Sequence, residues 1–326
     1  MTSTSARGPY FDELTHGQVF SDAPAVTLTE GAAAVHQSIV GDRLRIALDQ
    51  TLAEAVTGQS SVAHPAYVWN VAIGQSTLAT HHVRANLFYR GLAFHRAPRL
   101  GDTLFTTTTV VGLKQNSRRP GRPSTGLAAL HIQTVDQDQR TVLDFYRCAM
   151  LPLLNPDAET GHVDDLDEFG AEQPASAFAD HWDLTRFPQT DGQLALEAGT
   201  DITVVGGDVV SSAPELARLT LNVAQVHHDA RAAGGQRLVY GGHTIALALG
   251  QVSRALPQLV TILAWDSCDH IGPVHEGDTL RSQVHVLARR DHPSGGSQLD
   301  LRCLVSADST DEPRAVLDWR FKALLR

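Results

Sequence analysis

The feature that most constrains the fold of this chain is an internal repeat. The tetrapeptide Gly-Asp-Thr-Leu begins at Gly101 and again at Gly277, an offset of 176 residues. The dipeptide Gly-Gln begins at Gly74 and again at Gly250, at the same offset. A third match, Arg-x-Val-Leu-Asp, begins at Arg140 and recurs at an offset of 174. Three matches in one order at nearly one offset indicate two copies of a unit of about 150 residues.

The repeat divides the chain into three parts: residues 1–154, a linker at residues 155–180, and residues 181–326. The linker is rich in Asp, Glu, Gly and Pro and has no sustained apolar period, which predicts an exposed connection. Hydrophobic residues make up 42% of the chain and charged residues 19%, a balance that allows each repeat to bury its own core.

Each repeat has a predicted helix followed by predicted strands. Residues 64–79 and 242–256 predict the helices, and the second is apolar on every side near Ile245, as expected of a helix surrounded by a sheet. Gly74 and Gly250 fall within these helices, where close packing against strands would offset a cost of about 1 kcal/mol each. Alternating apolar residues predict strands with one buried face, at residues 104–111, 126–135, 141–151, 278–287 and 299–305.

A central helix wrapped by long antiparallel strands is the hotdog arrangement, so the predicted fold class is α+β, a double hotdog. We expect residues 17–151 and 183–325 each to form one hotdog. Joining two such sheets edge to edge removes an exposed edge from each. The sequence therefore predicts one continuous antiparallel sheet with both helices on one side.

Composition and charge exclude several classes of function. The net charge of −10 argues against a nucleic-acid partner, because phosphate binding needs a basic face. No apolar stretch approaches the roughly 18 residues of a membrane span, and the polar start lacks the apolar core of a signal peptide. The three cysteines, Cys148, Cys268 and Cys303, are far apart and lack metal-ligand spacing. We therefore expect a cytoplasmic protein with neither a metal nor another cofactor.

Six short segments carry a resemblance to a known family: YFD at 10–12, GQV at 17–19, GDTL at 101–104, VGLKQNS at 111–117, NVAQVHHD at 222–229 and YGGH at 240–243. Together they resemble the MaoC-like dehydratases, the (R)-specific enoyl-CoA hydratase family, and within them the mesaconyl-CoA hydratase (methylmalyl-CoA dehydratase) branch. The resemblance implies a lyase of fatty acid metabolism that adds water to, or removes it from, an acyl-CoA thioester. It also makes a homodimer possible.

The family motif is an Asp, a His five residues later and a second Asp two residues further on. The second repeat keeps His227 and Asp229 at this spacing but carries Asn222 at the first position. The resemblance implies that His227 is the general acid and base, that Asn222 holds the water, and that Asp229 contributes to substrate binding. An unperturbed histidine titrates near pH 6.5, which suits one group in both roles. The alternative is a loop histidine beside a capping asparagine.

Further candidates follow from the chemistry of a thioester enolate and of CoA. Backbone N–H groups of Gly242 and His243, at a helix start, would bind the thioester oxygen. Arg118, Arg119 and Arg122 would bind CoA phosphates from a loop near the pocket mouth. A plain helix start and a solvated hairpin tip are the respective alternatives.

The first repeat departs further from the motif. Asp42 and Asp49 are present, but Ala47 replaces the histidine, so the two carboxylates are interpreted as remnants or caps. This repeat is then free to shape the acyl pocket with large side chains that otherwise belong to the core: Tyr67, Trp69, Phe88 and Tyr89. Two other functions stay open on the sequence alone: a hotdog thioesterase and a non-catalytic acyl-CoA-binding protein.

Overall fold

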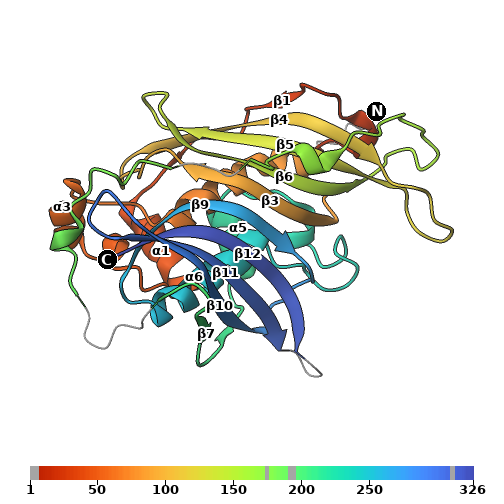
Figure 1. Cartoon of the computed structure of the whole chain (residues 1–326). Helices are drawn as coiled ribbons and strands as arrows, with labels where there is room; N and C mark the ends of the chain where they lie inside the picture. Colours follow the sequence, from red (N-terminus) through yellow and green to blue (C-terminus); the bar gives the residue numbers. More distant parts are fainter. Residues whose placement is uncertain (1–6, 173–175, 190–195, 309–312) are drawn as a thin grey trace.

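A computed structural model describes residues 7–172, 176–189, 196–308 and 313–326. Over these residues the chain forms one strongly curved antiparallel sheet with its principal helices on the concave side (Figure 1). The strand order is β1-β4-β5-β6-β3-β9-β12-β11-β10-β7, with β2 paired to β4 and β8 paired to β10. The predicted double hotdog is confirmed.

Each repeat has two short strands, then helices, then four long strands; among the described residues the first repeat has four α-helices and the second has two. The first consists of β1 (Val19–Phe20), β2 (Val26–Thr27), α1 (Glu30–Val40), α2 (Arg45–Leu48), α3 (Gln50–Thr57), α4 (Pro65–Gln75), β3 (Ala85–Phe94), β4 (Thr103–Gln115), β5 (Thr125–Val135) and β6 (Thr141–Pro152). The second consists of β7 (Asp201–Thr203), β8 (Asp208–Val209), α5 (Ala213–Leu219), α6 (Gly241–Ala255), β9 (Leu259–His270), β10 (Thr279–Asp291), β11 (Ser297–Asp308) and β12 (Arg314–Leu325).

The two sheets join through β3 and β9, which pair antiparallel with Tyr89 opposite Cys268. Sequence periodicity did not single out either strand. In β9 every residue from Leu259 to Trp265 is buried, so the alternation that marks a half-exposed strand is missing. A continuous apolar run of this kind is what a strand covered on both faces presents.

Helix α4 of the first repeat lies in the core of the whole molecule. It begins after His64, whose ring accepts the N–H of Ala66 at 3.0 Å, and every residue from Pro65 to Gln75 is buried. Its Trp69 meets Trp265 of the second repeat edge to face, with ring centroids 4.8 Å apart. The two repeats therefore share one core. In the part of the chain that the structure describes, no helix has the length and apolarity to cross a membrane.

The glycines of the two central helices allow close packing, but not against strands as expected, and Gly74 lies next to the last residue of α4 rather than mid-helix. A Cβ on Gly74 would lie 1.8 Å from the carbonyl oxygen of Thr220, which follows α5. A Cβ on Gly250 would lie 3.1 Å from the carbonyl oxygen of Val40, the last residue of α1. Each central helix thus packs at its glycine against the end of a helix from the other repeat.

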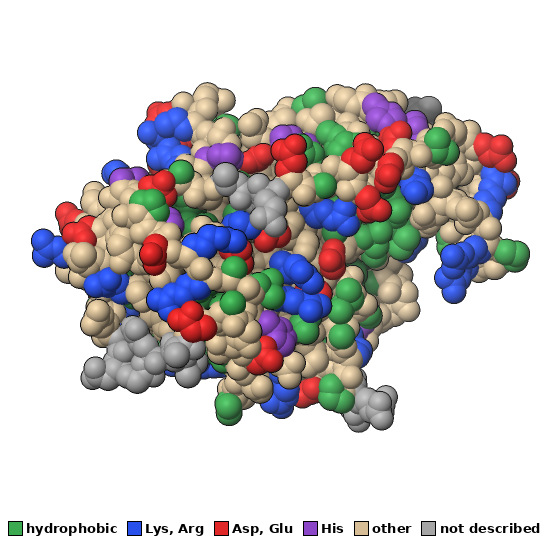
Figure 2. Space-filling view, viewed as in Figure 1, with side chains coloured by type: hydrophobic (Ala, Val, Ile, Leu, Met, Phe, Trp, Pro, Cys, Tyr) green, Lys and Arg blue, Asp and Glu red, His purple; other side chains and the backbone are tan. Residues whose placement is uncertain are grey.

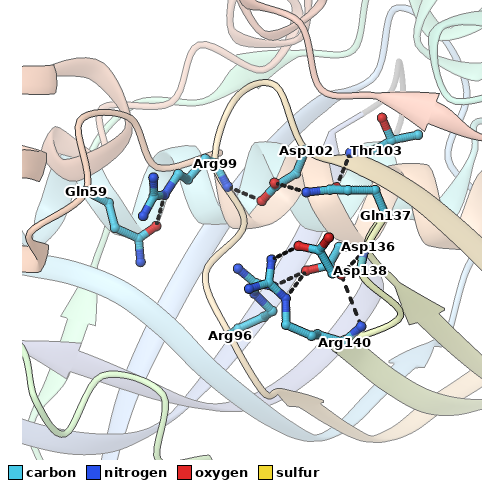
Figure 3. Close-up of polar contacts among 9 residues, drawn as sticks. All are labelled: Gln59, Arg96, Arg99, Asp102, Thr103, Asp136, Gln137, Asp138 and Arg140. Atoms are coloured by element: carbon cyan, nitrogen blue, oxygen red, sulfur yellow. Dashed lines mark hydrogen bonds and ion pairs between the residues drawn. The ribbon is translucent and has the colours of Figure 1, made fainter.

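The repeated Gly-Asp-Thr-Leu motif shapes the turn before a long strand. Asp102 accepts the backbone N–H of Arg99 at 2.8 Å, and Asp278 accepts that of His275 at 2.9 Å. Figure 3 shows Asp102 in this turn, next to the fully buried Asp136, whose carboxylate is held by two arginines. The motif that revealed the repeat therefore has a structural role.

The linker is less exposed than predicted. Its Val163 bridges to Lys114 on β4, and its Leu166 and Phe169 pack on the outer face of the first sheet. A Cβ on Gly112 would lie 2.5 Å from the Phe169 ring, so the glycine makes room for it. Leu166 and Phe169 stand in a polar segment without a sustained hydrophobic period, so the sequence did not indicate that they cover the sheet. Residues 173–175 of the linker lie outside the described residues.

Candidate active site

A cavity of about 110 Å³ lies between the sheet and the helices where the two repeats meet. Both repeats supply its walls, and the described residues that line it include no Asp or Glu. The polar side chains that line it are Thr77, Asn86, Tyr89 and Arg147 from the first repeat, and Asn222, His227, Tyr240, Thr244 and His270 from the second.

His227 is held as a neutral base at this cavity. Its Nδ1 lies 2.8 Å from the carbonyl oxygen of Leu238, and because a carbonyl only accepts, Nδ1 carries the proton and Nε2 keeps a free lone pair. Burial, with the nearby charges of His228 and Arg147, lowers the pKa of His227 to about 4. The expected titration near pH 6.5 is therefore wrong for the folded chain, in which the ring is unprotonated at neutral pH.

Asn222 faces the same cavity and is almost fully buried. Its Oδ1 accepts the N–H of Ala224 at 3.0 Å, which fixes the orientation of the amide. Its Nδ2 has no partner among the described residues. Its backbone carbonyl accepts Nε2 of His228 at 2.7 Å, so that histidine supports the loop. The sequence spacing thus brought a free N–H donor and a free imidazole lone pair to one cavity.

The N-terminus of α6 also reaches the cavity, one residue earlier than expected. The N–H of His243 donates to the carbonyl oxygen of Tyr240 at 2.9 Å, and its side chain is fully buried away from the lining. His243 therefore cannot donate to a ligand, and that assignment is wrong. The N–H groups of Gly241 and Gly242 have no partner among the described residues, and Gly241 lines the cavity. A helix start of this kind attracts negative charge.

The sequence and fold of the chain are similar to those of known proteins. No family model matches the chain. A solved structure of a conserved hypothetical protein from Mycobacterium tuberculosis, described as a double hotdog protein essential for bacterial survival during infection, is 55% identical and superposes with a TM-score of 0.91 over 98% of this chain and 99% of that one. A putative MaoC domain dehydratase from Chloroflexus aurantiacus is 27% identical, with a TM-score of 0.84 over 99% of each chain.

Two curated relatives match over similar lengths. Beta-methylmalyl-CoA dehydratase of Chloroflexus aurantiacus is 28% identical over 90% of this chain and 86% of its own length. Mesaconyl-CoA hydratase of Cereibacter sphaeroides is 26% identical over 93% of this chain and 91% of its own. The chain belongs to the MaoC-like double-hotdog family.

In the first repeat, the two carboxylates at the positions of the MaoC-like motif make structural contacts. Asp42 is buried, with Oδ1 accepting the N–H of Leu44 at 2.6 Å and Oδ2 lying 3.2 Å from Nε2 of His64. Since Nδ1 of His64 accepts the N–H that begins α4, Nε2 carries the ring proton and lies beside Asp42 without the geometry of a hydrogen bond. Asp49 caps α3. These contacts agree with the interpretation of Asp42 and Asp49 as remnants or caps.

Several predicted ligand-binding residues do not line the cavity of this MaoC-like chain. Asp229 is exposed and accepts the N–H of Arg231 at 2.8 Å, closing its own turn. Arg118 donates to the linker carbonyl oxygens of Asp157 and Ala158. Like Arg118, Arg119 and Arg122 are absent from the cavity lining. The roles proposed for these residues in binding substrate or CoA phosphates stay predictions.

Sequence reasoning missed two charged or titratable residues at the site, Arg147 on β6 and His270 at the end of β9. Burial and the nearby His227 lower the pKa of His270 to about 4. Of the large aromatics considered for the pocket, Tyr89 lines it, whereas Tyr67 and Trp69 are core residues and Phe88 packs under the linker. An arginine inside the apolar strand FYRCAML was the signal for Arg147.

Proposed function

We propose that this chain is a hydro-lyase that adds water across, or removes it to form, the double bond of an enoyl-CoA thioester. The observation that carries the proposal is the meeting of His227, Asn222 and the start of α6 at one cavity. The names of the curated relatives support the class of reaction.

In the hydration direction, a water sits between Nδ2 of Asn222 and Nε2 of His227. The amide donates to the water oxygen, and the imidazole accepts a water proton. The oxygen bonds to the β-carbon as the proton passes to Nε2, and the resulting imidazolium delivers that proton to the α-carbon. Dehydration is the reverse. Because the folded pKa of His227 lies near 4, the ring enters the cycle as the base.

The thioester oxygen gains negative charge as the β-carbon is attacked. Gly241 and Gly242 offer backbone N–H donors at the start of the 15-residue helix α6, whose dipole favours an anion there. A side chain at Gly241 would crowd His270, since a Cβ would lie 2.7 Å from Nε2 of that ring. Glycine at this position therefore makes room for the His270 ring beside the helix start.

The test is His227→Ala, assayed with a panel of enoyl-CoA thioesters for loss of conjugated thioester absorbance. We expect kcat/KM to fall about 100- to 10,000-fold, the usual contribution of acid–base assistance. His95→Ala is the matched control, because His95 pairs with Asp144 and does not line the cavity. An unchanged rate in His227→Ala would remove this residue from the mechanism.

The same assay separates the two other functions. With free thiol measured alongside, a hydro-lyase would lose the conjugated absorbance without releasing thiol, and a thioesterase would release thiol as the absorbance falls. A binding protein would leave both signals unchanged.

A further inference from the structure

His270, the last residue of β9, lies in the cavity beside the start of α6. A Cβ on Gly241 would lie 2.7 Å from Nε2 of the His270 ring and 2.9 Å from its Cε1. His227 lines the same cavity, and its ring is close enough to help lower the pKa of His270. The His270 imidazole therefore belongs to the same site as the candidate base and the N–H donors of the helix start.

The hydrogen-bonding groups of this ring have no partner in the described part of the chain. Nε2 of His270 is buried and unpartnered, and no hydrogen bond joins either ring nitrogen to another described residue. Neighbouring histidines differ: Nδ1 of His227 meets the carbonyl oxygen of Leu238, and Nε2 of His228 meets that of Asn222. A buried polar nitrogen without a partner is unfavourable, so we expect the partner of His270 on a bound molecule.

The surroundings of the ring support a partner from outside the chain. His243 also has unpartnered ring nitrogens, but it does not line the cavity, whereas His270 does. The described residues that line the cavity include no Asp or Glu, and Figure 2 shows acidic side chains spread over the visible outer surface. An N–H of His270 therefore meets no carboxylate of the described chain in this cavity, and a ligand oxygen is the acceptor that remains.

His270 is suited to donate a hydrogen bond rather than to transfer a proton. Burial and the nearby His227 lower its pKa to about 4, so at neutral pH the ring has one N–H and one lone pair. A neutral imidazole near a helix start can donate to the oxygen of a developing enolate and keep its proton. Proton transfer then stays with His227.

Other donors at the start of α6 are already engaged. The hydroxyl of Tyr240, the residue before the helix, donates to the backbone carbonyl oxygen of Asn70 at 2.9 Å. The N–H of His243 donates to the carbonyl oxygen of Tyr240. Gly241 and His270, by contrast, both line the cavity with groups that have no partner among the described residues.

We propose that His270 is a second catalytic residue, which donates a hydrogen bond to the thioester oxygen beside Gly241 and stabilises the negative charge that this oxygen gains. The catalytic role rests on the proposed hydro-lyase function. The hydrogen bond to the thioester oxygen does not, and it can be measured without any reaction.

The kinetic test compares three substitutions of His270 on an enoyl-CoA that the wild-type chain hydrates. His270→Leu removes the donor, and we expect kcat to fall about 100- to 1,000-fold, the usual loss for one donor to an oxyanion. His270→Asn places an amide N–H near the position of Nδ1, and His270→Gln places one near that of Nε2. One of these two should exceed His270→Leu by about 10-fold or more, because a donor need not carry a proton.

Two kinetic outcomes overturn the proposal. If neither amide variant exceeds His270→Leu, the ring transfers a proton or only fills space. If His270→Leu keeps the wild-type kcat, the ring does not stabilise the transition state. His131→Leu is the matched control, because His131 of β5 lies beside Asp144 and does not line the cavity, and it should leave kcat unchanged.

A binding test makes the two proposals fail separately. Titration calorimetry compares butanoyl-CoA with S-butyl-CoA, a thioether of the same length that lacks the carbonyl oxygen, and neither ligand can be hydrated. We expect the wild-type chain to prefer the thioester, and His270→Leu to reduce that preference about 3- to 10-fold, as for one hydrogen bond. This result supports the hydrogen bond even if no thioester is hydrated.

An equal preference in wild type and His270→Leu overturns the proposal, even if hydration is observed. A purely structural role would weaken both ligands alike and keep the preference, so it gives that same contrary result. If His270→Leu does not fold, His270→Phe replaces it in both tests. Phenylalanine keeps a ring to meet Tyr89, whose centroid lies 5.8 Å from that of His270, and has no N–H to donate.

Discussion

At the scale of single residues, the site depends on which atoms are left without partners. The bond from Ala224 to Oδ1 of Asn222 turns the amide so that Nδ2 stays free, and the bond from Nδ1 of His227 to Leu238 frees Nε2. Sequence spacing put both residues on one short segment. The tautomer and the amide orientation depend on Ala224 and Leu238, which no motif identifies.

Asn222→Asp should raise activity, because a carboxylate can accept a proton that an amide cannot. One oxygen would keep the bond from Ala224, and the other would take the place of Nδ2 facing the water. We expect kcat/KM to rise about 10-fold on a substrate that wild type turns over. The negative charge should also raise the pKa of His227 from about 4, moving the acid limb of the pH–rate profile upward.

The control for this variant is Asn222→Ala, which removes both the free donor and the bond to Ala224. It should be slower than wild type at every pH. An Asn222→Asp protein that is no faster, with an acid limb at the wild-type position, would show that the two side chains do not act on one water.

At the scale of elements, the two repeats pack against each other at Gly74 of α4 and Gly250 of α6. Alanine normally stabilises a helix interior by about 1 kcal/mol relative to glycine. At Gly74 the added Cβ would lie 1.8 Å from the carbonyl oxygen of Thr220, two residues before Asn222. Helix α4 therefore sets the position of the loop that carries the candidate catalytic residues, although it belongs to the other repeat.

Gly74→Ala should lower the free energy of unfolding by about 1–3 kcal/mol, since overpacking outweighs the gain in helix propensity. Activity should also fall, because Thr220 must move. Denaturant unfolding checks the first point and kcat/KM the second. Gly31→Ala, in α1 with open space around its Cβ, is the control and should stabilise slightly. Equal effects of the two substitutions would contradict the packing argument.

At the scale of the whole molecule, burial of histidines from both repeats makes folding sensitive to acid. His243 is fully buried with both ring nitrogens unpartnered within the described residues, and burial lowers its pKa to about 4. Burial lowers the pKa of His36 well below its usual value, with further contributions from His64 and His243. In the unfolded chain such histidines titrate near pH 6.5.

Between about pH 6.5 and pH 4 the unfolded chain therefore binds more protons than the folded chain. The stability that neutral His243 contributes is fully present above pH 6.5 and is lost as the pH falls toward 4, by about 3 kcal/mol between pH 7 and pH 4. Denaturant unfolding of wild type and of His243→Leu at both pH values tests this. The variant should lose less stability on acidification, and equal losses in the two proteins would contradict the lowered pKa of His243.

The sequence by itself determined the architecture. Offsets of 176 and 174 residues revealed two repeats. The spacing of apolar residues identified the central helices and most of the long strands, because a helix and a strand each impose a short-range hydrophobic period on the sequence. The short spacing from Asn222 to His227, five positions, also predicted that both side chains reach one cavity, as they do.

Only the tertiary structure decided how the two repeats complete one site. Tyr89 and Arg147 come from the first repeat, far in sequence from Asn222 and His227, and they meet because β3 joins β9 while α4 packs across the junction. The same packing fixed which N–H groups at α6 stay free and lowered the pKa of His227. Burial and hydrogen-bond partners depend on contacts between distant segments, and a local pattern does not contain them.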